Sequence, residues 1–117
     1  MILTFVCSIF SILIFLLNIK ISYAVGFQQI IFGVFEGRLW GFYANPNSLG
    51  QFALVSILLS VLLLCITDKN KKWYRIFLYT NILFEFICLI LANSRSSVLG
   101  LIISVLLLSV FMIAFNK

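Results

Sequence analysis

The sequence contains no histidine, and only three of its 117 residues are acidic. Without histidine, the chain lacks the most common general base and the most common metal ligand. No acidic pair lies within a short stretch, and no glycine-rich nucleotide loop follows a strand pattern. The sequence therefore predicts neither a self-contained active site of the usual types nor a metal site, and no cofactor is expected.

Cysteine is also scarce. Cys7, Cys65 and Cys88 all lie inside apolar segments, and none of them belongs to a C-x-x-C pair. Such spacing does not match a zinc site or a disulfide framework. We interpret the three cysteines as small packing residues.

Charge of either sign is rare, because charged residues make up 9% of the chain, hydrophobic residues make up 64%, and the mean hydropathy is +1.25. Ordinary soluble domains are about one-quarter charged, so we interpret this composition as excluding a soluble fold. The net charge of +5 comes from eight basic residues that lie at the ends of apolar runs. This dispersal indicates membrane topology signals, and no nucleic-acid partner is expected.

A helix needs ~20 apolar residues to cross the hydrocarbon of a bilayer, and four apolar runs are close to that length. In lipid each backbone polar group needs an internal partner, and continuous apolar runs contradict a barrel of alternating polarity. The predicted fold class is all-α: a polytopic transmembrane helix bundle, one domain over residues 1–117, with one long outer connection. The predicted spans are residues 2–19, 49–66, 76–92 and 98–115.

The predicted orientation rests on the loop of residues 67–75, which contains four basic residues and two aromatic ones. The positive-inside rule makes this loop cytoplasmic, and alternation then places both termini in the cytoplasm. The connection of residues 20–48 would lie outside. Its stretch 23–35 is apolar, but it is short and interrupted by glycine, so we expect a re-entrant or interface-lying element there.

Two arginines on the predicted outer side precede helix starts. Arg38 comes shortly before the second span, with Asn45 as a suitable N-cap and Pro46 at the first helical position. Arg95 comes just before the fourth span. Helix N-termini present unpaired N–H groups and a positive dipole end, so each start is paired with a guanidinium.

This pairing suits a phosphate or pyrophosphate, which arginine binds in fork geometry while helix N–H groups bind the remaining oxygens. Ser96 or Ser97 is the expected cap of the fourth span. The alternative is that Arg38 and Arg95 anchor the chain to lipid phosphates at the interface.

Glu85 lies near the middle of the third span, where a charge is costly unless it faces the protein interior. Asn81, Glu85, Cys88 and Ala92 share one helical face, which we predict to point into the bundle. Glu85 is either a proton relay or arginine partner, or a protonated or paired residue that holds helices together.

Small residues also recur at helical spacing on the second and fourth spans. Such stripes let membrane helices approach closely, and we interpret them as packing surfaces. They consist of Ala53, Ser56 and Ser60 on the second span and Gly100 and Ser104 on the fourth.

The motifs around the two arginines also occur together in one known family. Residues 38–50 contain Arg-x-x-Gly followed by Asn-Pro-Asn, and residues 93–100 contain Ser-Arg-Ser, with a span, a basic loop and another span between them. In this order the pattern resembles the superfamily of bacterial O-antigen ligases and O-antigen or capsular polysaccharide polymerases. The resemblance covers residues 33–108.

The resemblance implies a glycosyltransferase of the bacterial inner or plasma membrane, involved in lipopolysaccharide or capsule biosynthesis. It would polymerise or ligate polysaccharide repeat units from an undecaprenyl pyrophosphate carrier at the outer face. Arg38 and Arg95 would contact the carrier, and Asn45, Asn47 and Ser94 complete the implied substrate-binding set. Membrane lipid and other polysaccharide assembly proteins are the further partners implied.

Members of this superfamily are much longer, with more spans and a large outer loop. We therefore expect this chain to be a fragment that is too short to be active alone. Two alternatives remain open at this stage. One is a transporter or channel segment that uses Glu85, and the other is a non-catalytic membrane assembly subunit.

Overall fold

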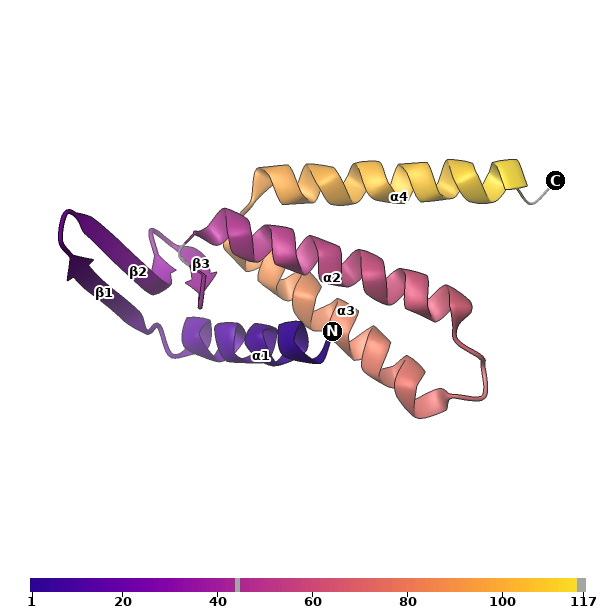
Figure 1. Ribbon diagram of the computed structural model, residues 1–117, viewed down its shortest axis with the longest axis horizontal. Helices are drawn as coiled ribbons and strands as arrows, with labels where there is room; N and C mark the ends of the chain where they lie inside the picture. Colours follow the sequence, from indigo (N-terminus) through magenta and orange to yellow (C-terminus); the bar gives the residue numbers. More distant parts are fainter. Residues whose placement is uncertain (44, 116–117) are drawn as a thin grey trace.

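The computed structural model describes residues 1–43 and 45–115 and shows four helices with a small antiparallel sheet at one end (Figure 1). The prediction of a mainly helical chain is confirmed, but all-α is wrong, because three strands follow the first helix. The elements, in chain order, are α1 (Ile2–Leu16), β1 (Lys20–Val25), β2 (Gln28–Phe35), β3 (Arg38–Gly41), α2 (Pro46–Ile66), α3 (Lys72–Ala92) and α4 (Arg95–Phe115).

The four helices coincide with the four apolar runs, although three of them begin three or four residues earlier than predicted. The early starts include polar residues, because a helix can continue past its apolar part, and at α2 the Asn45 side chain accepts a hydrogen bond from the first turn. Two helices, α2 and α3, are long and apolar enough to cross a membrane, a property that core helices of soluble proteins can share. Membrane crossing and orientation therefore stay predictions.

The sheet occupies the stretch for which a re-entrant or interface-lying element is predicted, and its position relative to a membrane stays a prediction. Its strands pair in the order β1-β2-β3, with two-residue connections between them. The second connection, Glu36 and Gly37, has φ of 51° and 74°, as a type I′ hairpin turn requires, and in the first connection Gly26 has φ of 63°. Of the two glycines in the stretch 23–35, Gly26 is a hairpin turn residue, while Gly33 lies within β2 with φ of 100°.

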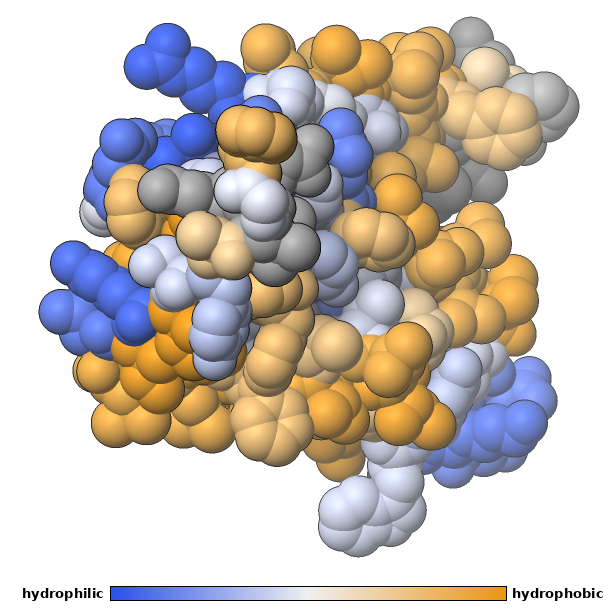
Figure 2. Space-filling model, turned by 60° about the vertical axis from the view of Figure 1, so that its left-hand side comes forward, coloured by the Kyte–Doolittle hydropathy of each residue, from blue (hydrophilic) through white to orange (hydrophobic). Residues whose placement is uncertain are grey.

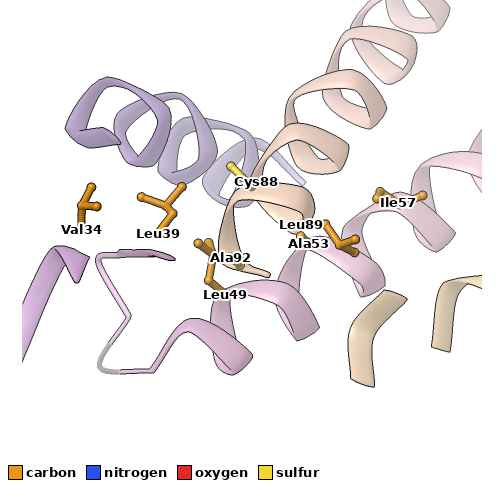
Figure 3. Close-up of a cluster of buried hydrophobic side chains, with 8 residues drawn as sticks. All are labelled: Val34, Leu39, Leu49, Ala53, Ile57, Cys88, Leu89 and Ala92. Atoms are coloured by element: carbon orange, nitrogen blue, oxygen red, sulfur yellow. The ribbon is translucent and has the colours of Figure 1, made fainter. Parts of the chain in front are cut away.

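The sheet is anchored to the helices by its third strand and by the end of its second. Val34 and Leu39, 7% and 0% exposed, belong to the main apolar cluster with residues of α2 and α3 (Figure 3). The other members of this cluster are Leu49, Ala53, Ile57, Cys88, Leu89 and Ala92. This anchoring brings the start of β3 next to the start of α2 and the end of α3.

Helix α4 lies alongside α2, and the two run in the same direction from the sheet end (Figure 1). Most large apolar side chains of α4 are exposed, including Leu106 at 61% and Val110 at 64%. Hydrophobic atoms also cover much of the face shown in Figure 2, where hydrophilic atoms are gathered into patches. Exposed apolar surface of this extent is typical of a face that contacts lipid or another apolar surface.

Candidate functional site

Four chain segments meet at the sheet end of the helices: the start of β3, the starts of α2 and α4, and the end of α3. Asn45 caps α2 as predicted, because its side chain accepts a 2.8 Å hydrogen bond from the backbone N–H of Asn47, with Pro46 at the first helical position. Helix α3 ends at Ala92, and Asn93 adopts a left-handed conformation with φ of 49°. The chain then turns directly into α4.

Arg38 joins three of these segments. Its Nε donates to the carbonyl oxygen of Ala92 at 3.0 Å, and its Nη2 donates to the carbonyl of Asn93 and to Oδ1 of Asn47, both at 3.1 Å. The last carbonyls of a helix lack internal partners, and they carry the negative end of the helix dipole. Arg38 therefore caps the C-terminus of α3 and ties it to the first turn of α2.

Arg95 is the contrasting cation. It is the first residue of α4, its side chain is exposed, and it has no hydrogen bond or ion pair with another described residue. The structure therefore brings together the two predicted arginines, but their contacts differ. The guanidinium of Arg38 is bound to the protein, while that of Arg95 has no partner among the described residues.

The two arginines line a common pocket of about 360 Å³. Its lining contains two cations and no acid, and the N-termini of α2 and α4 add their positive dipole ends. Because Nη1 of Arg38 makes none of the bonds described above, that nitrogen and Arg95 can both bind an anion in the pocket. The lining residues are Arg38, Asn47, Asn93, Arg95 and Ser96.

The structure places four of the sequence-predicted residues differently. Ser94 is fully buried and bonds the hydroxyl of Ser97 at 2.9 Å, so it does not line the pocket. Asn45 serves as the cap and is not among the lining residues either. Ser96 and Ser97 lie within α4, which begins before them, so the prediction that one of them precedes the helix as its cap is wrong.

Two lining residues were not predicted as ligands. Asn93 and Ser96 enter the pocket because α3 ends and α4 begins within three residues of each other. The signal was present in the sequence, since asparagine is favoured in a left-handed helix end. Its proximity to Arg38, 55 positions away, follows from the tertiary packing.

Gly50 allows the starts of α2 and α4 to approach closely. A Cβ at this position would lie 2.6 Å from Cβ of Ser94 and 2.8 Å from Oγ of Ser97. We expect Gly50→Ala to lower the free energy of unfolding by about 1–2 kcal/mol, although alanine favours a helix by about 1 kcal/mol. Thermal unfolding in detergent measures the change. Gly100→Ala is the control, since its nearest neighbour is the flexible end of Leu54 at 3.0 Å, and a Gly50→Ala protein as stable as Gly100→Ala would contradict the expectation.

A second polar region lies deeper, between α1, α2 and α3. The predicted inward face of α3 is confirmed, because Asn81, Glu85, Cys88 and Ala92 are at most 2% exposed. Nδ2 of Asn81 donates to the hydroxyls of Ser56 at 3.1 Å and Ser60 at 2.8 Å. The small residues of α2 therefore accept hydrogen bonds in addition to packing.

The loop between β3 and α2 lies near this region. Tyr43 stacks on Phe52 with ring centroids 5.0 Å apart. Burial raises the pKa of Tyr43, and the nearby Cys7 and Glu85 add to that effect. The phenol therefore stays neutral at physiological pH.

Comparison with protein-family models, with curated proteins and with solved structures gives no match for this chain. Function is therefore inferred from the arginine pocket and from the sequence motifs that form it.

Proposed function

We propose that the chain binds the pyrophosphate of an undecaprenyl-linked glycan in the arginine pocket, as a segment of a membrane glycosyltransferase that polymerises or ligates polysaccharide repeat units. The observation that carries the proposal is the pocket itself, where Arg38 and Arg95 face the same volume without an acidic residue. A pyrophosphate presents two adjacent anionic groups, which match two guanidinium groups and two helix N-termini.

The apolar part of the carrier would bind in a groove between α2 and α4, the helices whose N-termini face the arginine pocket. A groove of about 450 Å³ lies between α2 and α4, lined by α2 residues from Val55 to Cys65 and by Ser104, Leu107 and Leu108 of α4. Asn47 in the pocket and Val55 in the groove are eight residues apart, about 12 Å along the helix axis. A ligand with an anionic head and an isoprenoid tail is long enough to occupy both.

In the proposed reaction an acceptor hydroxyl attacks the anomeric carbon of the glycan, and undecaprenyl pyrophosphate leaves. Arg95 and Nη1 of Arg38 would stabilise the negative charge that develops on the leaving phosphate. The five lining residues include no carboxylate, and the chain has no histidine, so the pocket holds no general base for the acceptor proton. Carrier binding is therefore the part of the reaction that we assign to these residues.

The test is the affinity of undecaprenyl pyrophosphate for the chain in nanodiscs, with Arg95→Ala compared with the wild type. We expect a loss of about 10- to 100-fold, the size of one charge-assisted contact. Because Arg95 has no partner within the described protein, its removal should leave folding unchanged.

Lys69→Ala is the matched control, because it removes one positive charge from the exposed loop between α2 and α3, at the other end of these helices. Equal affinities of the wild type and both variants would contradict the proposal and leave Arg95 as an interfacial anchor. Equal losses of affinity in Arg95→Ala and Lys69→Ala would show that the carrier is attracted by the net positive charge of the chain and not by a specific site, and would also contradict the proposal.

A further inference from the structure

The polar region between α1, α2 and α3 contains buried acceptor oxygens for which the described residues supply no donor. Two of its buried oxygens, Oδ1 of Asn81 and Oε1 of Glu85, have no hydrogen-bond partner in the part of the chain that the structure describes, although these residues are 0% and 2% exposed. Buried polar atoms normally find a partner, and a buried carboxylate needs a positive charge or a proton. The polar side chains of this cluster are Thr4, Ser8, Ser56, Ser60, Asn81 and Glu85.

The hydroxyl hydrogens of the cluster are already committed. Thr4 donates to the carbonyl of Met1 at 2.7 Å, Ser8 to that of Thr4 at 2.8 Å, and Ser60 to that of Ser56 at 2.7 Å. Thr4 and Ser56 share a 3.2 Å hydrogen bond, and since the hydrogen of Thr4 is on Met1, Ser56 is its donor. With the hydrogens placed in this way, the hydroxyls present lone pairs to the middle of the cluster, and Ser8 or Ser56 can donate to the Glu85 carboxyl only by giving up one of these bonds.

Both amide hydrogens of Asn81 are committed as well, to Ser56 and Ser60. Turning the amide over would require those two hydroxyls to donate hydrogens that they already give elsewhere, so the network determines its orientation. In this arrangement Oδ1 of Asn81 and Oε1 of Glu85 have no donor among the described residues. The Ser8 and Ser56 side chains lie beside this carboxyl.

Among the described residues, no cation forms an ion pair with Glu85 either. The titratable neighbours of this carboxyl are Tyr43 and Cys88. A proton on Glu85 would satisfy one or two of the oxygens. A metal cation would satisfy several at once, because hard cations bind hydroxyl, amide and carboxylate oxygens together.

We propose that this cluster binds one small monovalent cation, such as Na⁺, through Oε1 of Glu85, Oδ1 of Asn81 and hydroxyl oxygens of Ser8 and Ser56. A single carboxylate matches a single positive charge. The ligands come from α1, α2 and α3, so the bound cation links α1 to the α2–α3 pair. This proposal is independent of carrier binding, since the arginine pocket contains none of these residues.

The experiment measures ²²Na⁺ binding and thermal unfolding of the full chain in nanodiscs, in NaCl and in N-methylglucamine chloride of equal ionic strength. We expect saturable Na⁺ binding and an unfolding temperature higher by about 5 °C in NaCl, because a ligand that binds the folded state stabilises it. Glu85→Gln keeps the shape of the side chain and should lose both effects. Glu36→Gln removes a carboxylate on the exposed hairpin and should keep both.

Ser8→Ala removes one ligand without changing charge, and we expect it to weaken Na⁺ binding about 10-fold while the chain stays folded. This variant tests the site even if Glu85→Gln fails to fold. Unfolding temperatures that depend on pH but are the same in the two salts would overturn the proposal in favour of a proton on Glu85. Na⁺ binding that is unaffected in Glu85→Gln or Ser8→Ala would overturn it as well.

Discussion

Arg38→Ala is expected to lower the free energy of unfolding by about 2–4 kcal/mol and to abolish carrier binding. The substitution leaves the carbonyls of Ala92 and Asn93 without their donor at the end of α3, and it releases Oδ1 of Asn47. The pocket would then lose one cation and the hydrogen bonds that join the end of α3 to the start of α2. Thermal unfolding and carrier binding in nanodiscs measure the two effects.

Arg95→Ala is the matched control for stability, because it removes the same charged group from the same pocket without breaking a contact within the described protein. Arg38→Lys should recover part of the stability, since one ammonium cannot reproduce the bonds that Nε and Nη2 make in different directions. Equal stability of Arg38→Ala and Arg95→Ala would contradict the capping role of Arg38.

Gly33→Ala is expected to lower the free energy of unfolding by about 3 kcal/mol or more. Gly33 has φ of 100°, which side-chain-bearing residues rarely adopt, and a Cβ there would collide with the carbonyl oxygen of Ile19. The backbone N–H of Val34 donates to that same oxygen at 3.1 Å. The alanine would therefore push β2 away from the connection between α1 and β1, and thermal unfolding with circular dichroism measures the loss.

Gly26→Ala measures the backbone contribution alone, so that its difference from Gly33→Ala gives the contribution of the collision. Gly26 also has a positive φ, 63°, but a Cβ at this position would meet no atom within 4 Å. We expect it to cost about 1–2 kcal/mol, from the backbone conformation alone. If both variants lost the same stability, the close approach of Gly33 to Ile19 would not matter for the fold.

The variants of the two polar regions also separate the hypotheses that the sequence left open. A carrier-binding segment depends on Arg95 and tolerates Glu85→Gln in binding assays. A transporter or channel segment depends on Glu85 and is indifferent to Arg95. A non-catalytic assembly subunit tolerates both changes but is sensitive to helix contacts such as the one at Gly50.

The helices were predictable because long apolar runs and cap residues act locally. Asn45 and Pro46 identify the start of α2 by a hydrogen bond within three residues, and no distant contact is needed for it. The strands of residues 20–41 were not predicted, because their apolar residues do not alternate clearly with polar ones. Their two-residue connections containing glycine were the available signal.

The candidate site was predictable in part for the same reason. Placing Arg38 and Arg95 before helix starts led to the expectation of an anion site, and both arginines do line one pocket. The sequence contained no information on how Arg38 divides its donors between protein and pocket. The burial of Ser94 depends on Gly50 of another helix, so it could not be read from the motif around Arg95.

The sequence by itself determined four apolar helices, the polar face of α3 and the two cations beside helix starts, because composition and helical periodicity are local properties. The tertiary structure decided which side chains meet. It assigned Arg38 to the end of α3, left Arg95 exposed, and enclosed Asn81 and Glu85 with hydroxyls whose hydrogens are already donated. Those roles depend on contacts between residues as much as 77 positions apart, from Ser8 to Glu85, which packing alone brings together.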